Sequence, residues 1–384
     1  MKRRQVLGLG CLGVASRAFA QQTGGQRANQ TPALPRGPIR VTGLAQFRSQ
    51  VVRLHLRHTW TTVMSSSDFR DVVRVELFRD GVTGLGEGAP IPRYRQTATS
   101  ALRALETVRP LVQRADWFEY VALLEAVQKR LPGETAAQAA LAGALADWLG
   151  QKLGLPLHRF WGLSPLLTPI TTFSIGIDTP ERTRQKVLEA ADFPVLKVKV
   201  GLDRDEATLA AVRQATQKPL RVDANEGFQT KERALAKLHA LAKQGVTLVE
   251  QPLPAAALAE AKWLYERSPL PIFADEACLV ASDIPRLAGT CHGVNIKLDK
   301  CGGVFEALKM IAVARAHGFK VMLGCMISSS VSIAAAAQIS PLVDFADLDG
   351  FLLIGNDTHE STTVRAGKLV LPDRPGLGLK PLAR

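Results

Sequence analysis

From residue 166 onward, short apolar runs rich in β-branched residues alternate with longer segments whose apolar positions recur at helical spacing. The short runs are typical of buried strands, and segments such as TKERALAKLHALAKQG are typical of amphipathic helices. Alternating strands and helices predict a parallel sheet with right-handed crossovers. Eight runs at roughly even spacing favour a closed α/β architecture, a TIM-like (β/α)8 barrel, over an open sheet. The runs are PITTFSIG, PVLKVKVG, PLRVDAN, VTLVEQP, PIFADEA, GVNIKLD, KVMLGCM and DFADLDG.

Residues 39–165 have a different pattern, in which strand-like segments come first and helical segments follow. FRSQVVRLHLRHTW and DVVRVELFRDGVTGLGEGAP predict strands, and the pair Asp80-Gly81 predicts a hairpin turn. The Ala-rich segment ETAAQAALAGALADWLGQKLG predicts a helix that ends at Gly154. We therefore expect an α+β capping domain at 39–165, the barrel at 166–350, and a C-terminal segment, 351–384, that packs on the cap.

The first 20 residues, MKRRQVLGLGCLGVASRAFA, combine a basic start, an apolar run and Ala18-Phe19-Ala20. This layout is that of a secretory signal, and the apolar run is too short for a membrane span. Arg3-Arg4 resembles a twin-arginine export signal, and residues 21–38 predict a linker because they are rich in Gln, Gly, Asn and Pro. We expect a periplasmic or otherwise exported protein with no membrane span after signal cleavage. A retained N-terminal anchor is the alternative.

The formal net charge is +13, but the basic residues are spread along the chain rather than clustered with aromatic residues. Nucleic-acid binding is therefore not expected, whereas a general attraction for anionic ligands is. Four cysteines follow the predicted signal, and none of them forms a CxxC pair. We expect buried thiols rather than disulfides at Cys278, Cys291, Cys301 and Cys325.

Charged or amide side chains stand at the ends of successive predicted strands. In a (β/α)8 barrel these strand ends converge on one rim, where active sites lie. Alternatively, Asp and Asn could simply cap the helices that follow, but this explains neither lysines at strand ends nor Glu250 before Gln-Pro. The rim residues are Lys197, Lys199, Asp223, Asn225, Glu250, Asp275, Glu276, Lys297, Asp347 and Asp349.

Three of these carboxylates, Asp223, Glu250 and Asp275, lie on three consecutive strands. They offer hard oxygen ligands with no His or Cys among them, which is a set that suits Mg²⁺. We expect one Mg²⁺ per subunit, with its open positions filled by water or substrate.

Lys199 and Lys297 lie on the strands on either side of that trio, and Lys197 shares a strand face with Lys199. We expect the neighbouring amine, the cation and partial desolvation to lower a lysine pKa from about 10.4 towards the range of about 7–8 that suits a general base. Two such lysines can remove a proton from one side of a carbon and return it from the other, while the metal stabilises the enediolate. Alternatively, both strand lysines form buried ion pairs with Asp223 and Glu250, which leaves Lys297 unexplained.

The motifs KVKVG, VDAN, VEQP, ADE and NIKLDKCGG, in this order and spacing, resemble the enolase superfamily in its muconate-lactonizing subgroup. The resemblance covers roughly residues 40–380. It implies a modified (β/α)7β barrel with an α+β cap built from the N-terminal segment and the tail. By that resemblance Lys199 and Lys297 are the acid/base pair and Lys197 contacts the substrate carboxylate. The implied Mg²⁺ ligands are Asp223, Glu250 and Asp275.

The motif DLD, Asp347 to Asp349, resembles the DxD signature of dipeptide epimerases, whose two carboxylates receive the α-ammonium group of the substrate. Two acids on one strand face can bind an ammonium group, and a metal at the same rim can bind a carboxylate. Together they predict a zwitterionic ligand whose length is set by the distance between the two sites. TTFSIGID and PRYRQT are also similar to this group. Alternatively, Asp347 could cap a helix or form a turn. Asn225 and Cys325 are further substrate-binding candidates.

The expected function is Mg²⁺-dependent epimerisation at the α-carbon of the C-terminal residue of a dipeptide, with Ala-Glu from cell-wall peptides as one candidate substrate. N-acylamino acid racemase, o-succinylbenzoate synthase or cycloisomerase activity is the alternative within the same fold. A non-catalytic peptide-binding protein is the third hypothesis. A small-molecule dipeptide is the expected partner, and we expect a homo-oligomer.

Two positions depart from the family pattern. Ser328 stands where the family usually has an acidic residue, which is expected to alter surrounding hydrogen bonds more than the chemistry. In the segment LRHTWTTVMSSSDFRD, alignment of Trp60 with the family's aromatic residue places Ser65 where Ala-Glu enzymes carry an arginine. Arg57 and Arg70 are the candidates to replace it, so the side-chain preference stays open.

Overall fold

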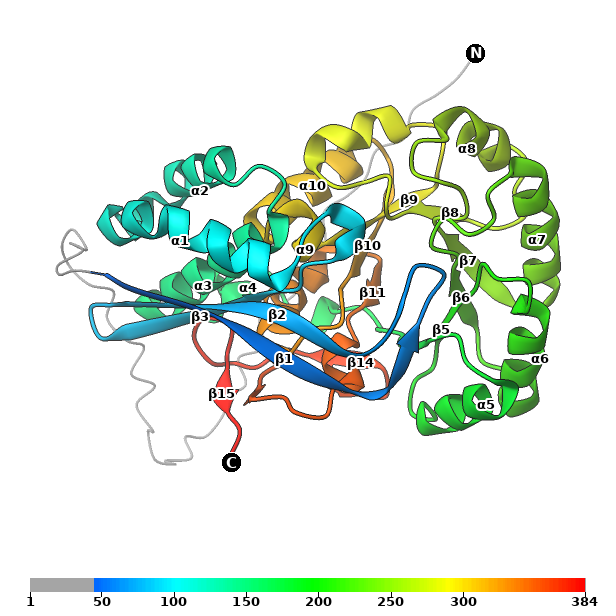
Figure 1. The fold of residues 1–384 in the computed structure, drawn as a ribbon, viewed down its shortest axis with the longest axis horizontal. Coiled ribbons are helices and arrows are strands. Elements are labelled where there is room, and N and C mark those ends of the chain that lie inside the picture. Colours follow the sequence, from blue (N-terminus) through cyan, green and yellow to red (C-terminus); the bar gives the residue numbers. More distant parts are fainter. Residues whose placement is uncertain (1–44, 384) are drawn as a thin grey trace, which may run out of the picture. The chain divides into compact units, whose positions relative to one another are not determined.

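The computed structural model describes residues 45–383, so the predicted signal and linker lie outside the described residues. The chain begins with a three-stranded antiparallel sheet in the order β1 (Gln46–Thr61), β2 (Ser66–Arg79) and β3 (Val82–Gly88). Figure 1 shows it in blue. Asp80 and Gly81 adopt left-handed φ angles of 52° and 76° between the paired residues Arg79 and Val82. The predicted Asp-Gly hairpin turn is therefore confirmed.

Four helices follow the sheet: α1 (Ala98–Arg114), α2 (Tyr120–Arg130), α3 (Thr135–Leu153) and the short α4 (Leu157–Phe160), with 3-10 turns η1 (Pro92–Tyr94) and η2 (Trp117–Glu119). Helix α3 ends as expected at Gly154, which is left-handed at φ 69°. It packs so closely on β3 that a Cβ on Gly86 would lie 2.0 Å from the carbonyl oxygen of Ala140. Small residues on both elements thus let the helix backbone lie directly against the sheet.

The second half of the chain forms eight parallel strands in consecutive order, β4 to β11. An isolated parallel bridge between Thr171 and Ala346 joins the first strand region to the last, so the sheet closes. The predicted barrel with an α+β cap is confirmed. The strands are β4 (Phe173–Ile175), β5 (Leu196–Lys199), β6 (Leu220–Asp223), β7 (Val246–Glu250), β8 (Ile272–Ala274), β9 (Gly293–Lys297), β10 (Lys320–Gly324) and β11 (Phe345–Asp347).

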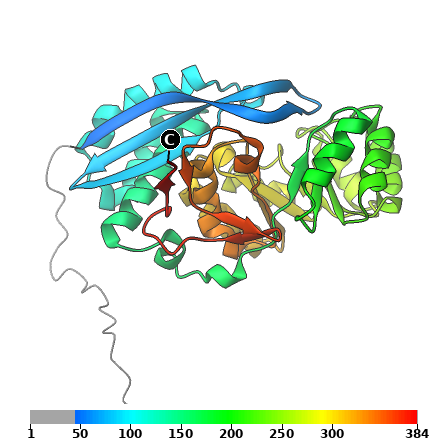
Figure 2. The ribbon, with the colours of Figure 1, turned by 90° about the horizontal axis from the view of Figure 1, so that it is seen from below.

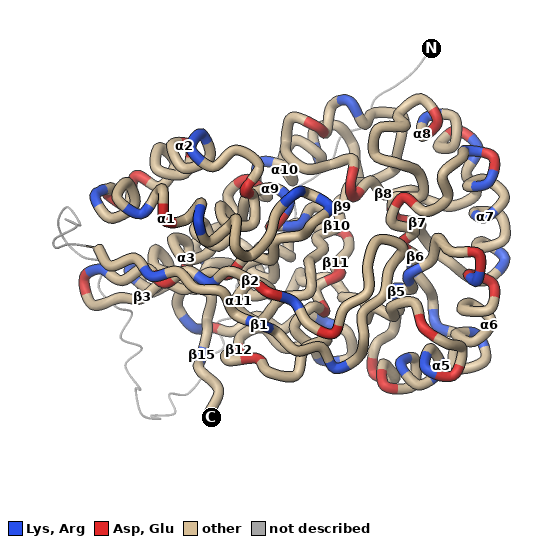
Figure 3. The backbone as a smooth tube through the Cα atoms, in the orientation of Figure 1, with Lys and Arg blue, Asp and Glu red and all other residues tan. Residues whose placement is uncertain are grey.

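Helices connect these strands, and the crossover between β8 and β9 is a 3-10 helix, η4 (Ala281–Leu287), instead of an α-helix. Thr179 and Thr230 cap α5 and α7 by accepting hydrogen bonds from backbone N–H groups in the first turn. Figure 3 shows basic and acidic residues interspersed along the outer helices α5 to α8. The helices are α5 (Pro180–Glu189), α6 (Asp205–Ala215), α7 (Lys231–Lys243), α8 (Leu258–Tyr265), α9 (Leu298–Cys301), α10 (Val304–Ala316) and α11 (Ser330–Ile339), with η3 (Pro165–Leu167), η5 (Ser340–Leu342) and η6 (Gly350–Leu353).

The C-terminal segment returns to the cap, and in Figure 2 it lies, in red, beside the blue sheet. The buried carboxylate of Asp147 in α3 accepts hydrogen bonds from the backbone N–H of Leu377 (2.7 Å) and of Leu85 in β3 (2.9 Å). One side chain therefore ties the tail, the helix and the sheet together. The tail holds two small antiparallel pairs, β12 (His359–Glu360) with β15 (Lys380–Pro381) and β13 (Thr363–Arg365) with β14 (Lys368–Val370).

A carboxylate of a buried ion pair in the cap sheet also binds the barrel rim. Arg74 in β2 donates to Glu87 in β3 at 2.7 Å, and the other carboxylate oxygen of Glu87 accepts the backbone N–H of Ser329 at 2.7 Å. The contact fixes the segment after β10 relative to the cap sheet.

All four cysteines among the described residues are free thiols; Cys278, Cys291 and Cys301 are buried as expected, whereas Cys325 is partly exposed. Between residues 45 and 383, no helix has the length and apolar character needed to cross a membrane.

Candidate active site

The two lysines of β5 point into the barrel. Alternation places Lys197 and Lys199 on one face, and they are 3% and 8% exposed. Val198 lies between them on the opposite face and belongs to the apolar core that includes Val187 of α5 and Val212 of α6. The strand therefore buries two ammonium groups inside the barrel, which requires partners of opposite charge.

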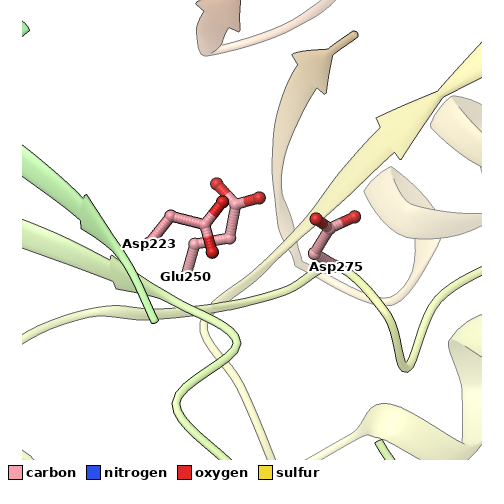
Figure 4. Close-up of side chains that lie close together, drawn as sticks. All are labelled: Asp223, Glu250 and Asp275. Carbon is pink, nitrogen blue, oxygen red and sulfur yellow. The ribbon is translucent and has the colours of Figure 1, made fainter. Parts of the chain in front are cut away.

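Those partners are the carboxylates at the ends of the next three strands. Asp223 ends β6, Glu250 ends β7 and Asp275 directly follows β8, and all three are buried. One oxygen atom from each lies within 4.8 Å of the others. Figure 4 shows Asp223 and Glu250 side by side, with Asp275 opposite them. Three buried carboxylates this close together are costly unless cations compensate their charge.

The donor set fits a hard divalent cation. All three ligands are carboxylate oxygens, which suits Mg²⁺. Within the described part of the chain, the side-chain oxygens Oδ1 of Asn225, Oε2 of Glu276 and Oδ1 of Asn295 are buried without a hydrogen-bond partner. Unsatisfied buried oxygens near a carboxylate cluster favour a positively charged or hydrated occupant.

In the structure, lysines compensate the carboxylates directly. Lys199 Nζ lies 2.6 Å from Asp223 Oδ2, and Lys297 Nζ lies 2.6 Å from Asp275 Oδ2. Lys197 Nζ contacts Glu250 at 2.8 Å and Asp223 at 3.1 Å. The ion pairs that we considered as an alternative are therefore present, and they include Lys297 as well.

These contacts correct one expectation. Burial lowers the pKa of Lys197, but the charges of nearby carboxylates together raise it well above its ordinary value, and the same holds for Lys297. For Lys297 the pKa shift is therefore opposite to the expected direction, because carboxylates at ion-pair distance outweigh burial and the neighbouring amine.

The pKa values of the three carboxylates are shifted in different directions. Burial raises the pKa of Glu250 to about 7, with Asp223 adding to the effect. For Asp223 and Asp275 burial acts in the same direction, but the neighbouring lysines hold the pKa below its ordinary value. Close acids with divergent pKa values are typical of functional sites.

Asp347 and Asp349 form a second acidic site, at the seam where the barrel closes. Asp347 Oδ1 accepts from Thr172 Oγ1 at 2.6 Å, and Asp349 Oδ2 accepts from the backbone N–H of Ser174 at 2.6 Å. Lys197 Nζ lies 2.6 Å from Asp347 Oδ2. Burial, with the charge of Asp347, raises the pKa of Asp349 to about 7.

The alternative that Asp347 is a helix cap is not supported. It is the last residue of β11, and η6 begins only at Gly350. Asp349, at the N-cap position of η6, makes no side-chain capping bond. Both carboxylates instead bind residues of the first barrel strand or the lysine of the second.

One cavity of about 530 Å³, here called the main cavity, collects the site. Lys199 and Lys297 open into it from β5 and β9, on either side of the three metal-binding candidates. Cap residues from the β1–β2 hairpin and from the segment around η1 line its other wall. Eight of the ten predicted site residues line this cavity, namely Lys197, Lys199, Asn225, Asp275, Lys297, Cys325, Asp347 and Asp349, while Asp223 and Glu250 are fully buried beside them.

The two weaker candidates also lie at the site. Asn225 adopts a left-handed φ of 43°, and its Nδ2 donates to Glu276 Oε1 at 3.2 Å. Asparagine adopts this conformation more readily than most other non-glycine residues. Burial raises the pKa of Cys325 well above its ordinary value, so this side chain lines the cavity as a neutral thiol.

Sequence reasoning missed the residues that hold the ligands in place. Lys300, fully buried in α9, donates to the carboxylate and carbonyl of Asp275 and to two further carbonyl oxygens. Asn295 Nδ2 donates to Glu250 Oε1 at 2.8 Å. Asn295 lies two residues before Lys297 on β9, so strand alternation could have identified it, whereas no sequence pattern shows that Lys300 turns back under Asp275.

The positions that depart from the family pattern are also visible. Ser328 is buried and donates to the carbonyl of Met326 at 3.1 Å. Ser65 and Arg70 line the main cavity, whereas Arg57 lines a smaller neighbouring cavity. Of the two arginines considered above, Arg70 is thus the one that faces the main cavity.

Residues 181–383 match the family described as enolase C-terminal domain-like, and residues 48–162 match the N-terminal domain of mandelate racemase / muconate lactonizing enzyme. An L-Ala-D/L-Glu epimerase of Bacteroides thetaiotaomicron is 44% identical over 327 residues, which cover 85% of each chain. An L-Ala-D/L-amino acid epimerase of Pedosphaera parvula is 42% identical and covers 86% of this chain and 97% of its own.

Among solved structures, the dipeptide epimerase from Enterococcus faecalis V583, complexed with Mg and the dipeptide L-Leu-L-Tyr, has a TM-score of 0.82 to this chain at 31% identity. The match covers 88% of this chain and 99% of that chain. Fold, site geometry and sequence likeness agree. The chain therefore belongs to the enolase superfamily, in the group of mandelate racemase and muconate lactonizing enzyme.

Proposed function

We propose that this protein is a Mg²⁺-dependent dipeptide epimerase that inverts the α-carbon of the C-terminal residue by removing a proton from one face and adding a proton to the other. The observation that carries the proposal is the placement of Lys199 and Lys297 in one cavity, on opposite sides of three carboxylates. The epimerases among its relatives support the same reaction class.

The roles follow from the positions of the charges. One lysine takes the α-proton from one face of the carbon, and the other delivers a proton to the opposite face. Lys197 lines the cavity between the two acidic sites and contacts the substrate carboxylate. Asp347 and Asp349 bind the α-ammonium group, so the substrate lies with its carboxylate towards Asp223, Glu250 and Asp275 and its amine towards the seam.

Mg²⁺ held by Asp223, Glu250 and Asp275 would neutralise these carboxylates, so that they no longer raise the pKa of Lys297, and would stabilise negative charge on the substrate carboxylate. Asn295 and Lys300 keep two of these carboxylates in position.

Mg²⁺ binding is testable without any turnover. The melting temperature of the wild type is expected to rise with Mg²⁺ concentration, because a ligand that binds only the folded state stabilises it, by about 2.7 kcal/mol at a hundred times Kd. Asp223→Asn is expected to abolish this rise. Asp203→Asn, which changes a carboxylate that is 96% exposed, is the matched control and keeps it. An equal Mg²⁺ response in Asp223→Asn and wild type would exclude the proposed metal site.

The N-acyl substrates of the alternative hypothesis fit the seam less well. An N-acylated amine carries no positive charge, so Asp349 would stay buried without a cation opposite it. A free ammonium group satisfies both carboxylates. The acidic pair therefore favours dipeptides with a free N-terminus.

Arg70 extends the proposal to the side chain of the C-terminal residue. The two lysines, the carboxylate and the peptide nitrogen occupy the other directions around the α-carbon of the C-terminal residue. The side chain of that residue therefore points towards the cap wall of the cavity. Arg70 lies in that wall. Burial alone lowers the pKa of its guanidinium, with no carboxylate among residues 45–383 opposing this effect. A glutamate side chain would supply the missing partner.

Arg70→Met is expected to lower the preference for Ala-Glu over Ala-Gln, measured as the ratio of kcat/KM values, by roughly tenfold to a hundredfold. This is the effect of losing a hydrogen bond of about 1.5–3 kcal/mol to a charged group. Arg57→Met is the matched control and leaves the ratio unchanged, because Arg57 lines the other cavity. Equal ratios in wild type and Arg70→Met would show that Arg70 does not bind the side chain.

Export remains part of the proposal, supported by the sequence pattern of residues 1–20. Cell-wall peptides would then be the source of the dipeptides. Fractionation of cells that express the full chain, compared with an Arg3→Lys/Arg4→Lys variant, tests it: the wild type is expected outside the cytoplasm, and the variant inside.

A further inference from the structure

Gln251 connects two of the proposed metal ligands. It directly follows Glu250, the last residue of β7, and its side chain is buried. Its Oε1 accepts the backbone N–H of Asp275 at 2.8 Å and the backbone N–H of Ala277 at 3.2 Å. The chain neighbour of one ligand therefore holds the backbone of another.

The other polar groups of Gln251 also form hydrogen bonds. Its Nε2 donates to the carbonyl of Leu253 at 2.7 Å. Its backbone N–H donates to the carbonyl of Phe273 in β8 at 2.9 Å, and its own carbonyl accepts the backbone N–H of Glu226 at 2.8 Å. These contacts fix Gln251 to β8 on one side of β7 and to the loop after β6 on the other.

Gln251 holds this position against its own conformational preference. Its φ is 37°, in the left-handed region that glutamine rarely adopts. The next residue is Pro252, and a proline favours an extended conformation in the residue before it. A strained backbone of this kind persists only where the surrounding contacts determine it. The hydrogen bonds of Gln251 therefore keep the residue in a conformation that its sequence context disfavours.

The rigidity of a ligand set influences which divalent cation it binds. Mg²⁺ requires near-ideal octahedral coordination at about 2.0–2.1 Å, whereas Ca²⁺ accepts more ligands at about 2.3–2.6 Å in flexible arrangements. Loosening a carboxylate site is therefore expected to weaken Mg²⁺ binding more than Ca²⁺ binding. Gln251 fixes the backbone of Asp275 relative to Glu250, so it is placed to supply this rigidity.

We propose that Gln251 is a positioning residue that selects Mg²⁺ over Ca²⁺ by holding Glu250 and Asp275 at a fixed separation. The inference rests on the metal site of the proposed function and adds a determinant of which cation that site takes. The two hydrogen bonds that the carboxamide oxygen accepts are the contacts that carry it.

The test measures the dissociation constants of Mg²⁺ and Ca²⁺ by calorimetry on the full chain after metal depletion, so no turnover is needed. Gln251→Met removes the carboxamide at similar size and is expected to weaken Mg²⁺ binding by about 10–100-fold, the usual effect of losing a group that orients a metal ligand. Ca²⁺ binding is expected to weaken less, so that the ratio of the Ca²⁺ to the Mg²⁺ dissociation constant falls by roughly tenfold.

Two further variants separate the carboxamide from the backbone strain. Gln251→Asn adopts the left-handed backbone more readily but is one methylene shorter, and it is expected to shift the ratio in the same direction as Gln251→Met. Gln251→Glu keeps an acceptor oxygen for both N–H groups. It is expected to keep the wild-type ratio, because its added charge acts on both divalent cations alike.

Gln138→Met is the matched control, because Gln138 is 7% exposed against 6% for Gln251 and donates to the carbonyl of Leu131 within the cap. It is expected to keep the wild-type ratio. An unchanged ratio in both Gln251→Met and Gln251→Asn, or an equal loss in Gln251→Glu and Gln251→Met, overturns the inference and leaves the proposed function standing. If the folded wild type binds neither cation, the metal site of the proposed function fails and the inference fails with it.

Discussion

Replacing Lys199 or Lys297 by alanine is expected to slow epimerisation strongly while leaving proton exchange on one face of the α-carbon intact. Each variant retains one base, which can remove and return hydrogen on its own face of the carbon. In D₂O, each variant should therefore incorporate deuterium into one epimer of the substrate without inverting it, and the two variants should act on opposite epimers. Epimerisation itself is expected to fall by about 10²–10⁴-fold, the usual contribution of a general acid or base.

The measurement is deuterium incorporation into both epimers by mass spectrometry, with chiral separation of the products. Lys237→Ala, on the outer helix α7, is the matched control and keeps wild-type activity. If neither variant exchanged hydrogen in either epimer, the lysines would not transfer protons. Their role would then be structural, through their ion pairs with Asp223 and Asp275.

The second large effect is expected at the seam. Asp349→Asn is expected to reduce kcat/KM for a dipeptide with a free amine by about a hundredfold or more. Removing one partner of a buried charge pair costs about 3–5 kcal/mol, and each 1.4 kcal/mol is a factor of about ten. The N-acetylated dipeptide, which carries no ammonium group, is expected to react equally in variant and wild type. A similar loss on both substrates would exclude Asp349 as an ammonium ligand.

The same carboxylate gives this prediction a pH signature. Burial and the charge of Asp347 raise the pKa of Asp349 to about 7, so the group is protonated below this pH and ionised above it. Because ammonium binding needs the ionised form, kcat/KM for the free dipeptide should rise as the pH increases through about 7. The pKa values of Glu250 and Glu276 are about 7 and about 8, so these groups also affect activity in this pH range. The contribution of Asp349 is therefore the part of the kcat/KM pH profile that is lost in Asp349→Asn.

The sequence was sufficient to predict the rim because strand geometry is strict. Residues two apart on a strand share a face, and parallel strands in a barrel end on one rim. Lys197 and Lys199, the three carboxylates and the DLD motif could thus be placed together before any coordinates. Glycines and alanines between β3 and α3 carried no such signal, because close backbone approach follows from packing and not from periodicity.

Two kinds of information were beyond sequence reasoning. The direction of the lysine pKa shift depends on distances of a few ångströms, since carboxylates at 2.6–3.1 Å from the Lys197 nitrogen reverse the effect of burial. The orientation of side chains outside regular strands was equally hidden. Lys300 turns back to Asp275 from a one-turn helix, and Arg70 faces the main cavity where Arg57 does not.

The closure of the barrel has an evolutionary consequence. The first and last strands meet through one bridge and through hydrogen bonds from Thr172 and Ser174 to Asp347 and Asp349. A substitution that removes the side-chain acceptor oxygens of these aspartates thus disturbs the joint of the barrel together with the recognition of the amine. Lineages that change substrate are expected to accumulate their differences in the β1–β2 hairpin, which lines the main cavity without being part of the barrel sheet.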